Sequence, residues 1–149
     1  MVLHMTQCSV LFLFLFYSIL SHSENITNSS HNLFFKNGKP KYEISYKNEL
    51  KHGQEIFWYE SGGKKMESHF INGLEEGAWS QWFENGQLKL EVIYKNGKEN
   101  GLWRHWYKSG NLKSNVKFIN GIKQGAETIW NKNGSVQSIE VYINGKVSK

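Results

Sequence analysis

The sequence contains no aspartate and only one arginine, Arg104, among its 149 residues. Its formal net charge is +5, but nearly all of the positive charge comes from lysine. Recognition of bases and phosphates usually draws on the bidentate guanidinium group, whereas lysines scattered among glutamates are typical of a solvated surface. We therefore expect no nucleic-acid partner.

Proline is also scarce, with Pro40 the only one, and the chain lacks the apolar stripes at 3.6-residue spacing that a helical bundle needs. Aromatic residues are instead abundant, at 15% of the sequence, and there are 14 glycines. Aromatic side chains suit pleated, half-buried surfaces, and glycines suit turns. This composition predicts an all-β protein with many short strands.

The longest apolar run, Val10 to Leu20, is too short to span a bilayer and has the length of a signal-peptide core. Small residues at Ser21 and Ser23 predict cleavage after Ser23. Residues 1–23 are therefore expected to be a signal peptide, and the protein to be exported to the periplasm, the cell surface or the exterior. Because the segment before the run lacks lysine and arginine, an uncleaved shallow membrane anchor is the alternative.

The single cysteine, Cys8, precedes this run, so the expected mature chain has neither disulfides nor thiol chemistry. Residues 24–37 are expected to form a flexible lead-in, polar from Glu24 to His31, and a first edge strand. Three Asn-x-Ser/Thr sites, at Asn25, Asn28 and Asn133, matter only in a eukaryotic secretory pathway.

From residue 38 onward the sequence repeats with a period of 24 residues and no insertions. The glycine that opens each unit recurs at Gly38, Gly62, Gly86, Gly110 and Gly134. The repeat domain, 38–149, thus divides into units 38–61, 62–85, 86–109 and 110–133 and a partial unit 134–149. An Asn-Gly pair in the middle of the unit and the opening glycine at its end predict two turns, and hence one β-hairpin, per period. The expected fold is an elongated sheet of successive antiparallel hairpins.

Tryptophan recurs in each full unit at the same phase, and we expect the resulting row to be the core that joins neighbouring hairpins. Its members are Trp58, Trp82, Trp106 and Trp130. Simple alternation along residues 88–94 places Leu88, Leu90 and Val92 on one face, with Lys89 and Glu91 on the other. The recurring lysines and glutamates are therefore expected to form weak ion pairs on a solvated face.

Trp79 and Trp103 differ from the fixed row, because their phase is occupied by Glu55 and Glu127 in the outer repeats. Alternation places them on the opposite face from the fixed tryptophans. Together with the neighbouring Arg104 and His105, they are the candidate partner-binding residues, with a second packed layer as the alternative.

No catalytic or metal-binding constellation is apparent in the sequence. The histidines beyond the signal segment occupy different phases of the repeat, and none has the short spacing of a zinc site. No Gly-x-Ser-x-Gly elbow is present, and the glycines are spaced for turns. We expect no enzyme activity, no metal and no cofactor.

Residues 94–110, with paired glycines and a Trp-Tyr-x-x-Gly ending, resemble the bacterial variant of the MORN (membrane occupation and recognition nexus) repeat found in YwqK-type antitoxins. The resemblance covers about residues 33–146. It implies a twisted antiparallel sheet and a role in neutralising a toxin, in scaffolding or at membranes. The sequence departs from it at Glu49, where the other units have glycine, and in its export signal, which conflicts with a cytoplasmic toxin.

The expected function is a non-enzymatic exported scaffold for protein–protein interaction. The alternatives are an antitoxin or immunity-type protein, association with anionic lipid or the cell envelope through the lysines, and carbohydrate binding by exposed aromatics. The sequence leaves the partner's identity and the oligomeric state open.

Overall fold

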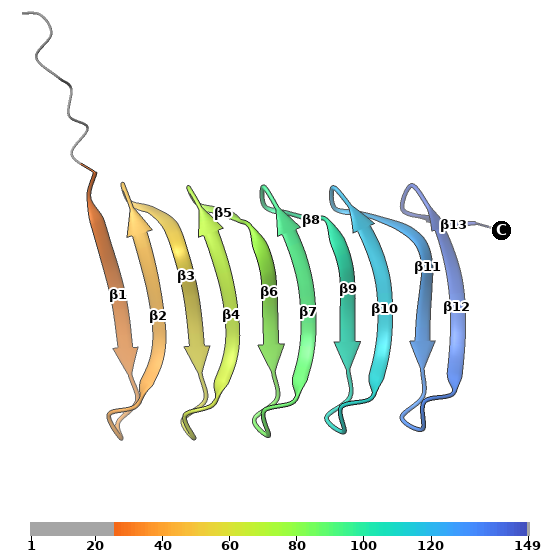
Figure 1. Cartoon of the computed structure of the whole chain (residues 1–149), viewed down its shortest axis with the longest axis horizontal. Coiled ribbons are helices and arrows are strands. Elements are labelled where there is room, and N and C mark those ends of the chain that lie inside the picture. The colour runs from red at the N-terminus through yellow and green to blue at the C-terminus, as the bar shows by residue number, and fades with distance from the viewer. Residues whose placement is uncertain (1–25, 149) are drawn as a thin grey trace, which may run out of the picture.

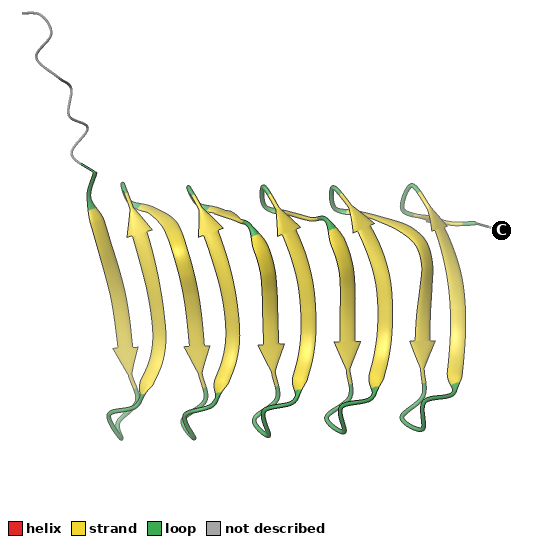
Figure 2. Cartoon of the chain, in the orientation of Figure 1, coloured by secondary structure: helices red, strands yellow, loops and turns green. Residues whose placement is uncertain are grey.

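The computed structural model describes residues 26–148 as a single open antiparallel sheet, and this part of the chain contains no helix (Figures 1 and 2). Its strands are β1 (Asn28–Phe34), β2 (Pro40–Lys47), β3 (Leu50–Trp58), β4 (Lys64–Ile71), β5 (Leu74–Glu75), β6 (Gly77–Trp82), β7 (Leu88–Lys95), β8 (Lys98–Glu99), β9 (Gly101–Trp106), β10 (Leu112–Ile119), β11 (Ile122–Trp130), β12 (Val136–Ile143) and β13 (Lys146–Val147). The expected signal peptide lies outside the described residues.

Strands follow one another across the sheet in sequence order, so each hairpin contacts only its neighbours (Figure 1). The two short strands β5 and β8 pair back onto β4 and β7, and each is the first part of a second strand that kinks before β6 or β9. The all-β architecture of successive hairpins is confirmed. The polar lead-in is shorter than expected, because β1 already begins at Asn28 and completes the hydrogen bonding of β2.

The turns in the middle of the repeats have the geometry that Asn-Gly favours. In the last four of them the asparagine has φ of 49–50° and the glycine 71–84°, both in the left-handed region. In the first turn Glu49 adopts φ of 65° without being glycine. Each turn glycine also donates its N–H to the preceding hairpin, as in Gly97 to the carbonyl of Glu75 at 2.9 Å, so the turns bond the repeats together.

A β-bulge lies at the end of each hairpin that is away from the Asn-Gly turn. It interrupts the simple alternation of lysine and glutamate that the sequence predicted, and that expectation was wrong at this point. Trp82 pairs with Leu88 while Gln81 pairs with Leu90, which leaves Lys89 as the extra residue. Four lysines at this phase place their ammonium groups 5.7–5.8 Å from the centroid of an aromatic ring. They are Lys41 over Phe35, Lys65 over Tyr59, Lys89 over Phe83 and Lys113 over Tyr107. These lysines form cation–π contacts instead of ion pairs along the strand.

The most deeply buried side chains do not belong to the fixed tryptophans, which are only half-buried. Ile44, Val92 and Val116 are 1–4% exposed, and they occupy one phase on every second strand. The interpretation of the tryptophan row as the core was therefore wrong. A one-layer sheet fully covers only the small side chains in the middle of a face, because larger neighbours on the adjacent strands close over them.

Residues directly opposite in the register share a face, and this defines two surfaces. The Val92 face carries Val92, Trp79, Trp103 and Val116, because Trp79 pairs with Val92 and Trp103 with Val116. The other surface, the Arg104 face, carries Arg104 and its partners in register, Glu91 and Asn115.

Candidate functional site

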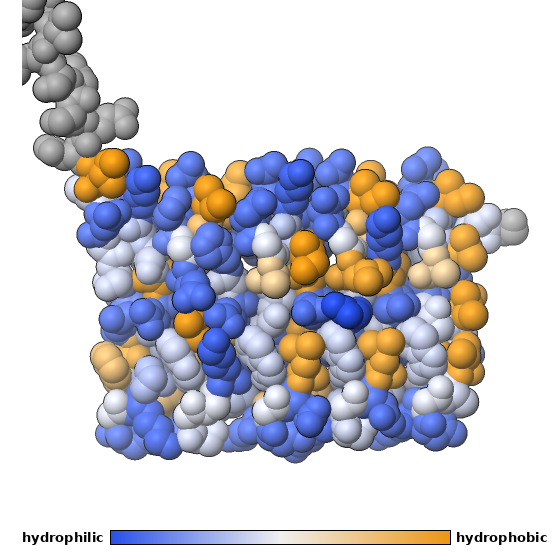
Figure 3. Space-filling model, in the orientation of Figure 1, coloured by the Kyte–Doolittle hydropathy of each residue, from blue (hydrophilic) through white to orange (hydrophobic). Residues whose placement is uncertain are grey.

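Figure 3 shows one broad face of the sheet, where hydrophobic and hydrophilic groups alternate in short patches, with a hydrophobic column over β12. This column comes from the exposed Val136, Ile139 and Val141 of the last long strand. The patches reflect the repeat, because each hairpin presents the same phases at regular intervals. A site specific to one place on the sheet must therefore come from positions where the repeats differ.

The clearest such difference lies on the Val92 face of the two central repeats. We name it the central patch and define it by Glu75, Trp79, Tyr94, Glu99 and Trp103. Glu75 lies opposite Phe70, and Glu99 opposite Tyr94, where β5 and β8 begin the second strands. The tryptophans follow four residues later on β6 and β9.

The two tryptophans are not equally accessible. Trp103 is 37% exposed, and its ring meets the edge of Phe118 at a centroid distance of 5.7 Å. Trp79 is half-buried. Trp79 is the cross-strand neighbour of buried Val92, and Trp103 that of buried Val116, so both tryptophans border the core and remain partly exposed.

The outer repeats show what these two phases hold elsewhere in the chain. In the first repeat, Lys51 occupies the position of Glu75 and Glu55 occupies the position of Trp79. Their side chains form an ion pair of 2.8 Å. Lys123 and Glu127 repeat this pair at 2.7 Å. Each lysine ammonium also lies 4.7 Å from the centroid of the next ring, Phe70 for Lys51 and Tyr142 for Lys123.

Glu55 is a buried carboxylate with a structural role. It is 7% exposed and accepts hydrogen bonds from Lys51 at 2.8 Å, from Ser68 at 3.1 Å and from Tyr42 at 3.4 Å. Burial, followed by the negative charge of Glu55, raises the pKa of Tyr42 to about 12. A carboxylate satisfied by three donors is held in place by them, which makes it a poor general base.

The central patch, in contrast, contains carboxylates without a cation. The four ion pairs in residues 26–148 do not include Glu75 or Glu99, and the cation–π contacts of this region do not include Tyr94 or Phe118. The pKa of Tyr94 is raised by burial, then by the charges of Glu99 and Glu75. Both carboxylates therefore act on the same tyrosine between them.

Arg104 and His105 do not form a single patch with the tryptophans. Arg104 lies on the opposite face, where it pairs with Glu91 and its guanidinium carbon is 5.7 Å from the centroid of the Trp106 ring. His105 shares the Val92 face but lies further along the strand, opposite Leu90 and Ser114. Burial lowers its pKa, with smaller contributions from Lys113 and Lys89.

Sequence reasoning missed the lysine-to-glutamate exchange at the phase of residues 51, 75, 99 and 123, although the period would have revealed it. It also missed the residues that bond the turns together. Asn72 donates its backbone N–H to His52 Nδ1 at 3.4 Å, and Asn96 donates to Glu76 Oε2 at 2.8 Å. Asn100 and Gln124 serve the two following turns in the same way. His52 and Glu76 therefore accept hydrogen bonds from the Asn-Gly turn of the next repeat.

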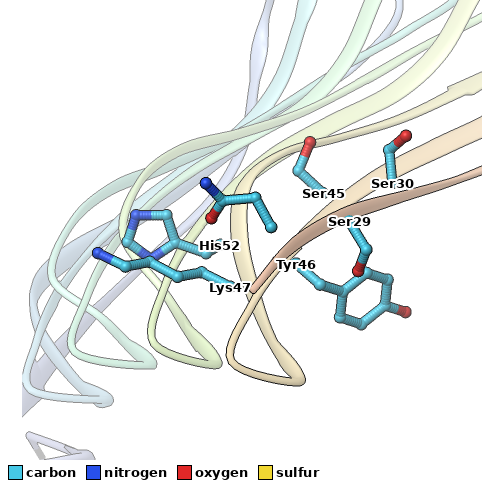
Figure 4. A pocket seen from close by; sticks show the side chains of 7 residues that line it. Ser29, Ser30, Ser45, Tyr46, Lys47 and His52 are labelled. Carbon is cyan, nitrogen blue, oxygen red and sulfur yellow. The ribbon is translucent and has the colours of Figure 1, made fainter. Parts of the chain in front are cut away.

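Figure 4 shows a shallow hollow near the N-terminal edge, lined by residues that include Ser29, Ser30, Ser45 and His52. In this view Ser30 and Ser45 point to one side of the sheet while Ser29 points to the other. His52 Nδ1 accepts the backbone N–H of Asn72, so it is not placed as a base for a serine nucleophile.

Residues 26–148 contain no group of three or more potential metal ligands and no helix long and apolar enough to cross a membrane.

An open sheet of successive, sequence-similar hairpins defines a β-repeat protein. The family model for the MORN repeat variant matches residues 32–48, 51–72, 75–96 and 99–120, which is more than half of the chain, and the chain belongs to this family. It is a non-catalytic repeat family generally associated with binding to proteins or membranes. No curated protein matches the sequence.

Proposed function

We propose that this protein is a non-enzymatic, exported scaffold that binds a partner protein through the central patch of its Val92 face. The observation that carries the proposal is the exchange at two phases of the repeat. The outer repeats neutralise themselves with a lysine–glutamate pair, whereas the central repeats present Trp79 and Trp103 beside unpaired carboxylates. Aromatic side chains with one free side are the residues that most often dominate protein interfaces.

The one-layer architecture supports binding over catalysis. Each broad face is open to solvent along its length, and the hollows at its turn end and its N-terminal edge are shallow. A flat surface of this kind suits another protein chain better than a small substrate, which needs a cavity that encloses most of its surface.

The test is affinity capture from the extracellular and envelope fractions of the source organism, with the double variant Trp79→Ser/Trp103→Ser. It should keep its far-ultraviolet spectrum and lose a partner that the wild type retains. Leu102→Ser is the matched control, because Leu102 is 45% exposed and neighbours Trp103 on the opposite face. A partner that is lost with Leu102→Ser and kept by the double variant would contradict the proposal.

An antitoxin or immunity role is one specific form of this proposal, in which the captured partner is a toxin. Co-expression decides it: the wild type should rescue growth from the captured protein, and the double variant should not. Rescue by both variants alike would place the antitoxin activity away from the central patch.

A second candidate, binding to anionic lipid, is favoured by the row of bulge lysines Lys41, Lys65, Lys89 and Lys113. Neighbouring members lie one repeat apart, so together they form a regular line of positive charge. Co-sedimentation of residues 24–149 with phosphatidylserine vesicles tests it. Binding that disappears at high salt and in a variant with all four lysines changed to glutamine would favour this candidate, and no sedimentation would exclude it.

A further inference from the structure

The central patch has the composition of a cation site whose cation is not supplied by the protein itself. In the first repeat, the Lys51 ammonium lies between the Glu55 carboxylate, at 2.8 Å, and the Phe70 ring, at 4.7 Å. In the fourth repeat, Lys123 lies in the same way between Glu127, at 2.7 Å, and the Tyr142 ring, at 4.7 Å. The same scaffold therefore binds an ammonium group twice, with nearly identical distances.

In the second and third repeats the lysine phase is occupied by Glu75 and Glu99, while the aromatic phase is kept as Tyr94 and Phe118. The carboxylate has moved to the former lysine position, and tryptophan has replaced the former glutamate. Each central repeat thus retains an acid and a ring, and gains a second ring, but has no lysine between them. Carboxylates and aromatic faces together are the groups that attract ammonium ions most strongly in proteins.

Two lysines flank this patch on the same face, Lys51 beyond Phe70 and Lys123 opposite Phe118, and each is already paired with a glutamate of its own repeat. The other positive charges lie further away. On the Val92 face, Lys89, Lys113 and His105 lie near the bulge end of the strands, as their joint effect on the histidine shows. Lys95 and Lys98 pair with each other at the turn end, one residue away from Tyr94 and Glu99 and so on the opposite face. The negative part of the Val92 face is therefore limited to the region around Glu75 and Glu99.

We propose that the central patch binds a basic segment of the partner protein, with one lysine against Glu75 and a second against Glu99, so that each ammonium group meets a carboxylate and an aromatic ring, the same pair of groups that Lys51 and Lys123 contact in the outer repeats. This inference rests on the proposed function and names the chemistry of its partner. Equivalent strands of consecutive repeats are two strand spacings apart, roughly 10 Å. A segment in the polyproline II conformation rises about 3.1 Å per residue and returns to the same side every three residues, so it covers that distance with the spacing Lys-x-x-Lys.

The direct test uses the peptide acetyl-Gly-Lys-Gly-Gly-Lys-Gly-amide and the indole N–H resonances of Trp79 and Trp103. The peptide should shift both resonances at low salt, and the shifts should fall at least fivefold when both lysines are acetylated. Glu75→Gln/Glu99→Gln should remove the response, whereas Glu43→Gln/Glu84→Gln, which removes the same charge elsewhere, should keep it. Equal responses to both peptides, or equal losses in both variants, would overturn the inference.

A second variant keeps the test independent of folding. Glu75→Lys/Trp79→Glu/Glu99→Lys/Trp103→Glu copies the outer repeats into the central ones, so it should fold with two additional internal ion pairs. Because it lacks both reporter tryptophans, its response is measured by isothermal titration calorimetry, in which the wild type should bind the peptide and this variant should not. A folded form that still responds would contradict the inference. The two proposals also separate in the capture experiment: a partner lost with Trp79→Ser/Trp103→Ser but kept by Glu75→Gln/Glu99→Gln would leave the scaffold function standing and refute the basic segment.

Discussion

Arg104 forms an ion pair with Glu91 across the pairing of β7 and β9, on the face opposite Trp103. The guanidinium also lies against the ring of Trp106, and its buried Nε has no hydrogen-bond partner. The only arginine of the chain thus links two strands within the third repeat, although its position next to Trp103 had made it a candidate for partner binding.

The first prediction concerns this pair. Arg104→Met should lower the free energy of unfolding by about 1 kcal/mol, because it leaves the half-buried Glu91 carboxylate without its partner. In a double-mutant cycle with Glu91→Gln, urea unfolding should give a coupling energy of about 0.5–1 kcal/mol, since both side chains remain partly solvated. Capture of the partner should not change. A coupling of zero, together with loss of capture, would assign Arg104 to the interface.

Gly101 should not tolerate a side chain. A Cβ atom at this position would lie 2.9 Å from the Cβ of Ile93, and the backbone φ of 156° is one that other residues rarely adopt. Gly101→Ala should therefore cost about 2 kcal/mol in chemical denaturation. Gly63→Ala is the control, because it has an ordinary φ and open space around it. Equal stability of the two variants would contradict the close approach of β9 to β7.

Glu49 should be replaceable with a gain in stability. It adopts φ of 65° at the phase where the following turns have glycine. Glu49→Gly removes the strain of a left-handed residue, and part of that gain is offset by the greater freedom of glycine in the unfolded chain. We expect a net stabilisation of about 0.5–1 kcal/mol, seen as a higher melting temperature. The same change at Glu43, within β2, should destabilise the protein.

Acid should weaken the fold through His105. Its pKa is lowered by burial and by Lys113 and Lys89, so the unfolded chain takes up the proton first as the pH falls. The stability due to its neutral form is fully present above the unfolded pKa, near 6.5, and is lost as the pH falls toward the lowered value. The difference in unfolding free energy between wild type and His105→Gln, measured from pH 8 to 5, should decrease over this range. A constant difference would refute the shift.

Removing one whole repeat should leave a shorter folded protein. Deletion of residues 87–110 joins Gly86 to Asn111 and preserves both the turn phase and the side-chain alternation. Because hairpins contact only their neighbours, the product should melt cooperatively at a lower temperature. Deletion of residues 92–114 removes one residue fewer and joins Glu91 to Asn115 within a strand, so it turns the side chains that follow to the wrong face and should not fold. Similar melting of the two products would contradict a fixed register.

The period alone was sufficient to predict the strands, the turns and the hairpin architecture, because Asn-Gly and the opening glycine limit the backbone to few conformations. Period-two counting failed at Lys89, since a bulge adds a residue there and interrupts the alternation that separates the two faces. The fixed tryptophans were interpreted as the core because every full repeat has one. Burial in a single layer depends instead on position within a face, and sequence identity between repeats does not report it.

The candidate site was predictable only in part. Comparison of the repeats shows that Trp79 and Trp103 stand where the outer repeats have glutamate. The same comparison could have shown that Glu75 and Glu99 stand where the outer repeats have lysine. That Arg104 lies on the other face from Trp103 follows from alternation, but its pairing with Glu91 depends on the register between β7 and β9. The cation–π geometry of Lys51 and Lys123 requires side-chain positions, which no spacing provides.

The strands lie across the long axis of the sheet, so the backbone hydrogen bonds between them run along its length (Figure 1). A force that pulls the two ends of the sheet apart would load these bonds one strand pair at a time. The protein should therefore unzip at low force from its edges, releasing up to 24 residues per hairpin, while it resists shear along the strands far better. A sheet built this way can be dismantled stepwise by traction on one terminus without a single cooperative rupture.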